Sequence, residues 1–174
     1  MDMITKLTVA AERLFDRHGY MATGMDRLTE AAGMSSRTLY KHASSKAQLM
    51  ARVLTERDRR FMARLEVRTV DALFAALEDW VRVEGCRGCL FLRSRAETGG
   101  DTPEIAEAVA AHKEAFHQRI GEVVAMELGR EDPAIAEQVL VLLEGATHAA
   151  VYRGAQTVSA ARAAAFILLE RARS

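Results

Sequence analysis

The sequence contains few of the features that stabilise small secreted or membrane proteins. Its 174 residues include only two cysteines and two prolines. Two cysteines, Cys86 and Cys89, cannot provide a disulfide framework, and so low a number fits a reducing compartment. No stretch approaches the roughly 18 to 20 uninterrupted apolar residues that span a bilayer, and Met1–Lys6 lacks the order of a signal peptide. We therefore expect a cytoplasmic protein that does not contact a membrane.

The chain also lacks the alternating pattern of β-strands. Apolar residues make up 49% of the sequence and recur at intervals of three and four, which predicts an all-α protein with a sizeable core. Glycines and capping residues divide this pattern into about nine helices. Thr23, Ser35, Ser45, Thr102 and Asp132 are the expected N-caps of five of them. The expected helical ranges are about 4–18, 25–32, 36–42, 46–64, 70–84, 89–98, 103–128, 133–153 and 159–174.

The formal charge of the whole chain is zero, but its two ends differ. Residues 1–60 contain eleven lysines and arginines against seven aspartates and glutamates, an excess of four positive charges. The remainder has the opposite excess, with thirteen against seventeen. An excess of four is compatible with an ordinary solvated surface. It matters here because the most polar predicted helix lies in the basic part of the chain.

That polar helix, residues 36–42, follows a short helix and a turn that contains Gly33. Two short helices joined in this way are typical of a helix-turn-helix, in which Leu28, Ala31 and Leu39 would hold the helices together. The remaining side chains carry hydroxyl and cationic groups, which bind phosphate oxygens and base edges of DNA. A solvated pair of helices with no role in DNA binding has the same composition. Both interpretations are open at this point.

Residues 4–50 also carry a longer series of short motifs in a fixed order. These are Leu14-Phe15, Gly19-Tyr20, Thr23 with Met25, Ala31-Ala32-Gly33, Thr38-Leu39-Tyr40 with His42, and Ser45-Lys46 with Leu49. In order and spacing, the segment resembles the N-terminal DNA-binding domain of the TetR family of bacterial transcriptional repressors. Further along the chain, Arg87–Leu92, Ala96-Glu97 and His112-Lys113 resemble the C-terminal domain of one subgroup of that family.

The resemblance implies two domains: a helix-turn-helix domain of three helices in residues 1–46, and a helical ligand-binding and dimerisation domain in 47–174. It implies a homodimeric repressor that is not an enzyme, uses no cofactor or metal, and binds palindromic double-stranded operator DNA until a small-molecule effector binds. Carried over by position, the residues expected to hold phosphates are Thr23, Thr38, Tyr40, His42 and Lys46. Those expected nearest the bases are Ser36, Arg37 and Lys41.

The sequence departs from the family pattern in two places. Ala43 stands where the family usually has an aromatic residue, so we expect Met50 or Met34 to fill the corner between the third and fourth helices. Lys6 is the only cation before or at the start of the first helix, whereas many relatives carry a basic arm there. Support from the minor groove is therefore not expected.

The C-terminal part offers two sets of candidate residues. An effector pocket among the helices of residues 70–153 would be lined by Phe74, Leu77, Trp80, Phe91, His112, Phe116, Leu143 and Thr147. A dimer interface formed by the last two helices would contain Ile135, Val139, Leu142, Ala146, Phe166 and Leu169. Each of these apolar residues could instead belong to the core of one chain.

Cys86-Arg87-Gly88-Cys89 has the spacing of a redox-active dithiol. It suggests an alternative function, a thiol-based redox-sensing regulator or an oxidoreductase. No second cysteine pair exists, so we do not expect a metal site. A third possibility is a helical interaction module with no role in DNA binding.

Overall fold

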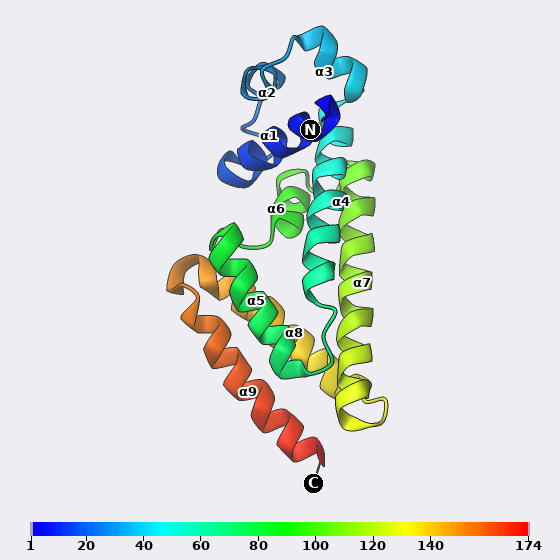
Figure 1. The fold of residues 1–174 in the computed structure, drawn as a ribbon, viewed down its shortest axis with the longest axis vertical. Helices are drawn as coiled ribbons and strands as arrows, with labels where there is room; N and C mark the ends of the chain where they lie inside the picture. Colours follow the sequence, from blue (N-terminus) through cyan, green and yellow to red (C-terminus); the bar gives the residue numbers. More distant parts are fainter. Residues whose placement is uncertain (1, 174) are drawn as a thin grey trace. The chain divides into compact units, whose positions relative to one another are not determined.

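The computed structural model describes residues 2–173, and these residues form nine α-helices and no strand (Figure 1). The predicted all-α fold is confirmed. The helices are α1 (Met3–His18), α2 (Met25–Ala32), α3 (Ser36–His42), α4 (Lys46–Arg64), α5 (Val70–Glu84), α6 (Leu90–Glu97), α7 (Pro103–Leu128), α8 (Pro133–Arg153) and α9 (Gln156–Arg173). The last helix begins three residues earlier than the sequence predicted.

The chain divides into two compact units. The first contains the residues up to Arg59 together with Leu90–His112, and the second contains Arg60–Cys89 together with the residues from Lys113 onward. Helices α4 and α7 therefore each contribute one part to either unit, and α6 belongs to the first unit. The expected functional boundary between residues 46 and 47 stays a prediction.

The first unit has a core of its own. It contains fully buried side chains from α1, α2, α3 and α4, namely Leu7, Ala11, Phe15, Leu28, Leu39, Leu49, Met50, Val53 and Leu54. The ring of Tyr20, expected as an anchor after the first helix, lies with its centroid 5.7 Å from that of Phe15. Of the two methionines considered for the corner near Ala43, Met50 is fully buried and Met34 only partly.

Three of the five predicted N-caps are confirmed, and that at Thr102 stays a prediction. Ser35, Ser45 and Asp132 each accept a hydrogen bond from the backbone N–H three residues later. The prediction for Thr23 is wrong, because Gly24 is the N-cap of α2 and makes no side-chain cap. The Thr23 hydroxyl instead donates to the carbonyl oxygen of Gly19 at 2.7 Å, so the side chain closes the loop before α2.

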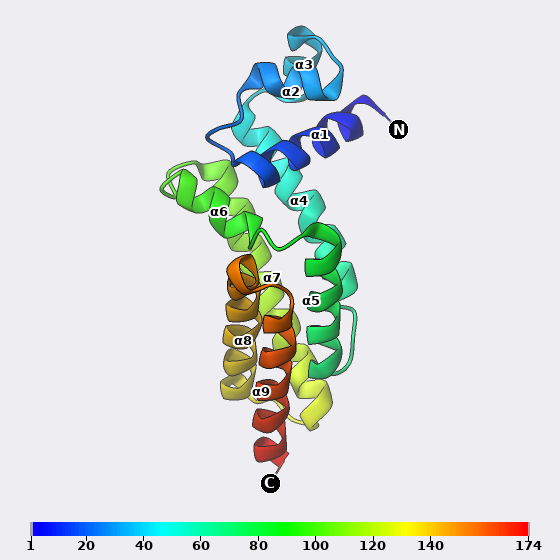
Figure 2. The ribbon, with the colours of Figure 1, turned by 90° about the vertical axis from the view of Figure 1, so that its left-hand side faces the viewer.

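The second unit is a helical bundle in which α8 and α9 pack along each other and α5 packs against both (Figures 1 and 2). Its core draws on α5, α7, α8 and α9 and includes Phe74, Leu77, Trp80, Ile120, Val123, Val139 and Leu169. By length and composition alone, α8 is the one helix in residues 2–173 that could cross a membrane. It carries Glu137 and Glu144, and only 28% of its most apolar 18-residue stretch is buried.

Replacement of Leu39 tests the packing of α3. Leu39 is fully buried, so Leu39→Ala should lower the free energy of unfolding by about 2–5 kcal/mol through lost burial and a residual cavity. In the same first unit, Leu92→Ala is a matched control because Leu92 is exposed, and it should change stability by less than about 0.5 kcal/mol. Urea unfolding of both variants measures the difference. Equal destabilisation by the two changes would contradict the described core.

Candidate nucleic-acid interface

The turn between α2 and α3 is built by Gly33. Its backbone is left-handed, with φ 63° and ψ 39°, a conformation that glycine adopts without steric cost. The N–H of Gly33 donates to the carbonyl of Glu30, and the N–H of Met34 donates to the carbonyl of Thr29. These two bonds form a Schellman motif, which satisfies the last carbonyls of α2. The chain then turns directly into the Ser35 cap of α3, which makes the predicted helix-turn-helix.

Helix α3 presents most of its side chains to solvent. Leu39 is its only buried residue, whereas Ser36, Arg37 and Lys41 are exposed. Tyr40 is 53% exposed although it is aromatic. The seven residues of α3 contain no carboxylate. The outward face therefore combines hydroxyl groups with two cations, which is the chemistry that binds phosphates and guanine edges.

The other residues predicted to bind DNA are less available. The hydroxyls of Thr38 and Ser35 lie 2.9 Å apart and bond to each other, and both Thr38 and His42 are partly buried. Thr23 is fully buried and donates its hydroxyl hydrogen to Gly19. Its predicted contact to a phosphate is therefore not compatible with this structure, since the hydroxyl is already used inside the protein.

Lys46 lies at the start of α4, with its ammonium nitrogen 4.3 Å from the centroid of the Tyr20 ring. This cation–π contact joins α4 to the loop that follows α1. Burial lowers the pKa of Lys46, and the negative charge of Glu97 partly offsets that effect. Burial likewise raises the pKa of the Tyr20 hydroxyl, with a smaller contribution from Glu104. Lys46 thus helps to position the helix-turn-helix besides supplying a positive charge.

Two side chains of α6, Glu97 and Arg93, bind the end of α1 and the loop that follows it. A carboxylate oxygen of Glu97 accepts from the backbone N–H of Met21 at 2.8 Å. Gly19 has φ 90°, a conformation that favours glycine, and a Cβ there would lie 2.8 Å from the same carboxylate and displace it. Arg93 donates to the carbonyl oxygen of Asp16 at 2.9 Å. The sequence analysis missed these contacts because the partners are more than 70 residues apart in the chain.

Arg27 of α2 is a further basic residue that the sequence analysis missed. Its guanidinium donates to Nε2 of His18 at 3.0 Å, which requires the neutral imidazole as acceptor. Partial desolvation lowers the pKa of His18, and the positive charges of Arg27 and Arg17 add to that effect. Arg17, His18 and Arg27 are all exposed, so the two arginines extend the positive surface of α1 and α2.

The residues predicted to line an effector pocket fall into both units. Phe91 and His112 belong to the first unit, where their rings stack at 3.7 Å and Nδ1 of His112 lies 2.7 Å from Asp58. Phe74, Leu77, Trp80, Phe116 and Leu143 are buried in the core of the second unit. Thr147, in the second unit, donates its hydroxyl hydrogen to the carbonyl of Leu143. Phe61, which the sequence analysis did not select, packs edge-on against both Trp80 and Phe116.

Only some of the residues predicted for the dimer interface are accessible on the surface of the single chain. Val139, Ala146 and Leu169 are buried in the core of their own chain, so they do not form an outward face. Ile135 and Leu142 are partly buried, and Phe166 is exposed. The structure reveals further exposed apolar side chains on the same two helices: Val141, Val151, Tyr152 and Ile167. A signal for them exists in the sequence, because helices that are apolar on more than one face need more than one partner.

Cys86 and Cys89 are free thiols and are both partly buried. The Sγ of Cys89 lies 3.7 Å from the ammonium of Lys113, which also forms an ion pair of 2.5 Å with Glu144. Within residues 2–173, no group of three or more histidine, cysteine, aspartate or glutamate side chains is arranged to hold a metal ion.

Comparison with known sequences gives a match where the helix-turn-helix lies. Residues 7–53 match the family described as bacterial regulatory proteins, tetR family. The HTH-type transcriptional activator FasR of Mycolicibacterium smegmatis is 45% identical over 49 residues, which are 28% of this chain and 22% of that protein. An uncharacterized HTH-type transcriptional regulator of Mycobacterium tuberculosis is 28% identical over 138 residues. That alignment covers 74% of this chain and 64% of the relative, so the chain spans less than two thirds of either relative.

Solved structures extend the likeness to the whole chain. A TetR-family transcriptional regulator from Streptomyces coelicolor, SCO4454, superposes with a TM-score of 0.89 at 25% identity, covering 99% of this chain and 96% of that one. A TetR transcriptional regulator from Legionella pneumophila has a TM-score of 0.81 at 15% identity, covering 97% of both chains, and shows the common fold. The helix-turn-helix of this chain therefore matches the tetR family of bacterial regulatory proteins, and the arrangement of helices in residues 2–173 is the fold of TetR-family transcriptional regulators.

Proposed function

We propose that this protein is a cytoplasmic, homodimeric transcriptional repressor that binds palindromic operator DNA through α3 and is released by a small-molecule effector. One observation carries the proposal. Helix α3 buries Leu39 alone and exposes Ser36, Arg37, Tyr40 and Lys41 on a face without a carboxylate. A face of this kind matches the acceptors that a DNA major groove and its phosphates present.

Under this proposal, the exposed residues of α3 make different kinds of contact with DNA. Arg37 is the residue able to donate two parallel hydrogen bonds to O6 and N7 of a guanine, which gives sequence preference. The Tyr40 hydroxyl and the Lys41 ammonium reach phosphates or nearby base edges and give affinity. Short polar side chains at Ser36 and Thr38 allow the helix to approach the groove closely. The cation–π contact between Lys46 and Tyr20 holds the start of α4, which follows α3, against the loop after α1.

Palindromic recognition needs two α3 helices related by a twofold axis. Helices α8 and α9 expose an apolar face that a second copy would cover. On α8, Val141, Gly145, His148 and Tyr152 are exposed at intervals of three and four, and on α9 Ala160, Ala163, Phe166 and Ile167 are exposed in the same way. Val141 and Ile167 are 62% and 67% exposed in the single chain, which is unusual for two β-branched residues on adjacent helices.

The effector site belongs in the second unit under this proposal, around Trp80 and Phe116. Both rings pack against Phe61, at 5.1 and 5.5 Å, and the guanidiniums of Arg60 and Arg64 lie within 6 Å of the Trp80 ring. Trp80 is the single tryptophan of the chain, so its fluorescence reports on ligands that bind nearby. A compound that changes Trp80 emission and also releases DNA would identify the effector class.

The name of the Mycolicibacterium smegmatis relative describes an activator, and repression is our proposal for this chain. A repressor binds at a site that overlaps the promoter that it controls. The position of the bound DNA site relative to the promoter therefore distinguishes repression from activation. The redox alternative through Cys86 and Cys89 stays a prediction that neither the comparisons nor the described residues support.

Salt dependence of binding to duplex DNA tests the proposed DNA contact. Each neutralised phosphate contributes about 0.9 to the slope of log affinity against log salt. Lys46 is expected to hold a phosphate, so Lys46→Ala should weaken binding on every duplex and reduce that slope by about one. Arg95→Ala is the matched control, because it removes an exposed cation of α6 in the same unit. Fluorescence anisotropy over a salt series measures both. An unchanged slope for Lys46→Ala would contradict the contact.

Arg37 should determine preference at one base pair in each half-site. Arg37→Ala should lose about 1–3 kcal/mol of discrimination at that position and leave the other positions unaffected. Competition between a bound duplex and copies that differ at single base pairs measures the loss. If Arg37→Ala weakened all sequences equally, Arg37 would be a phosphate contact and our assignment of its role would be wrong.

A charge on the apolar face of α8 and α9 should prevent dimer formation. Ile167→Glu would bury a carboxylate without a partner, so the variant should sediment as a monomer. Val83→Glu on α5 is the matched control, because Val83 is 66% exposed and lies outside that face. Analytical ultracentrifugation distinguishes the two masses. The interface proposal fails if Ile167→Glu stays dimeric, or if the native chain is a monomer at micromolar concentration.

A further inference from the structure

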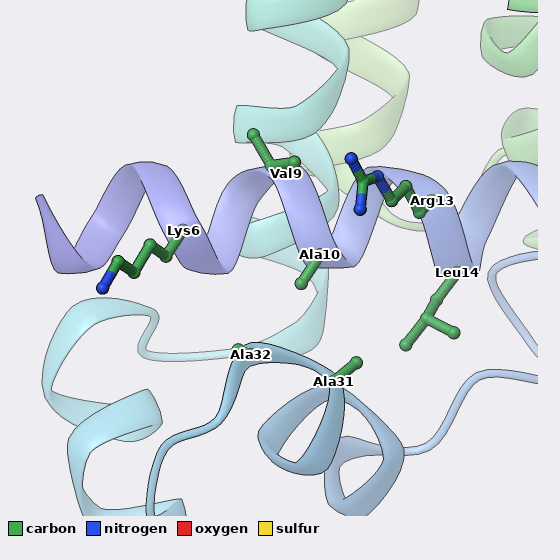
Figure 3. Close-up of a pocket in the computed structure, with 7 residues that line it drawn as sticks. All are labelled: Lys6, Val9, Ala10, Arg13, Leu14, Ala31 and Ala32. Atoms are coloured by element: carbon green, nitrogen blue, oxygen red, sulfur yellow. The ribbon is translucent and has the colours of Figure 1, made fainter. Parts of the chain in front are cut away.

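The first unit contains an open groove between α1 and α2 that the proposed DNA contact does not use. It has a volume of about 460 Å³ and is lined by Lys6, Val9, Ala10, Arg13, Leu14, Ala31 and Ala32. Figure 3 shows Ala10 and Leu14 of α1 pointing toward Ala31 and Ala32 at the end of α2. Lys6 and Arg13 lie along α1 on either side of Ala10. The groove thus has an apolar floor between two cations.

The acidic and basic side chains of α1 lie on different faces of the helix. Glu12 forms an ion pair of 2.8 Å with Arg57 of α4, and Asp16 is buried and contacts Arg93 of α6. Both carboxylates of α1 are therefore engaged away from the groove. Lys6 and Arg13 are exposed, and neither has an ion-pair partner among residues 2–173. No carboxylate lines the groove, so its electrostatic character is purely positive.

From this geometry we infer that the groove is a docking site for an acidic amphipathic helix of a partner protein. The small side chains of Ala10, Ala31 and Ala32 allow another helix to approach closely, while Val9 and Leu14 offer apolar contact. Lys6 and Arg13 are seven residues apart on one helix, which corresponds to a rise of about 10.5 Å. Two carboxylates seven positions apart on a partner helix have the same spacing.

DNA would also be attracted by the two cations. The apolar floor argues against DNA as the occupant of the groove. A phosphate backbone is hydrated and offers no apolar groups to Val9, Leu14 and the three alanines. An amphipathic helix satisfies both parts of the groove, because its leucines cover the floor and its carboxylates meet the cations. The inference does not depend on the proposed function, since the peptide is tested without DNA.

A labelled helical peptide of about fifteen residues tests the inference on the full chain. The probe carries glutamates at positions i and i+7 and leucines at i+3 and i+4, and a scrambled peptide of equal charge serves as the comparison. Fluorescence anisotropy should show saturable binding at one peptide per chain, at least tenfold tighter than the scrambled peptide. The variant Lys6→Glu with Arg13→Glu should weaken binding at least tenfold.

The matched control carries Arg52→Glu with Arg95→Glu, which changes the net charge equally at exposed positions outside the groove. It should bind the peptide within twofold of the native chain. A peptide with lysines in place of both glutamates should bind the Lys6→Glu, Arg13→Glu variant better than it binds the native chain. Thermal unfolding confirms that the variants remain folded.

Three results would overturn the inference. Equal affinity for the designed and scrambled peptides would show attraction by charge alone. Failure of the lysine peptide to prefer the charge-reversed variant would show that Lys6 and Arg13 do not pair with the probe. Loss of duplex DNA binding in the Lys6→Glu, Arg13→Glu variant, together with no peptide binding by the native chain, would assign the groove to DNA.

Discussion

The burial of one leucine determines which side of α3 faces outward. A seven-residue helix is too short to be stable alone, so its position depends on its contacts with the rest of the protein. Leu39 supplies the apolar contact, the Ser35 hydroxyl caps the first turn, and the left-handed Gly33 sets the direction from which the chain enters. With Leu39 inside, Arg37, Tyr40 and Lys41 must point to solvent. The proposed recognition surface is a consequence of this arrangement.

The same short helix-turn-helix is held by contacts from distant parts of the chain. Glu97 binds the Met21 backbone, Arg93 binds Asp16, and Lys46 covers the Tyr20 ring. Because α6 supplies two of these three contacts, a movement of α6 changes the support of the loop between α1 and α2. Under the proposed function, an effector that shifts α6 between two positions would alter the spacing of the two recognition helices of a dimer.

Local features of the structure could be predicted from the sequence, and long-range ones could not. The caps at Ser35, Ser45 and Asp132 depend on residues three apart, so the sequence patterns identified them correctly. Thr23 has the same local pattern, but a loop that closes on Gly19 uses its hydroxyl. Likewise, the periodicity of α8 and α9 marks apolar residues on several faces without indicating which face is internal. Val139 and Leu169 proved to be internal, and Val141 and Ile167 external.

Selection of bound duplexes from a random DNA pool tests the central claim most directly. Two outward α3 helices related by a twofold axis require an inverted repeat whose half-site centres lie about one helical turn apart or a multiple of it. We predict that the native chain enriches such a palindrome. Enrichment of no sequence, or of a single site without symmetry, would contradict the account of α3 as one of two recognition helices related by a twofold axis.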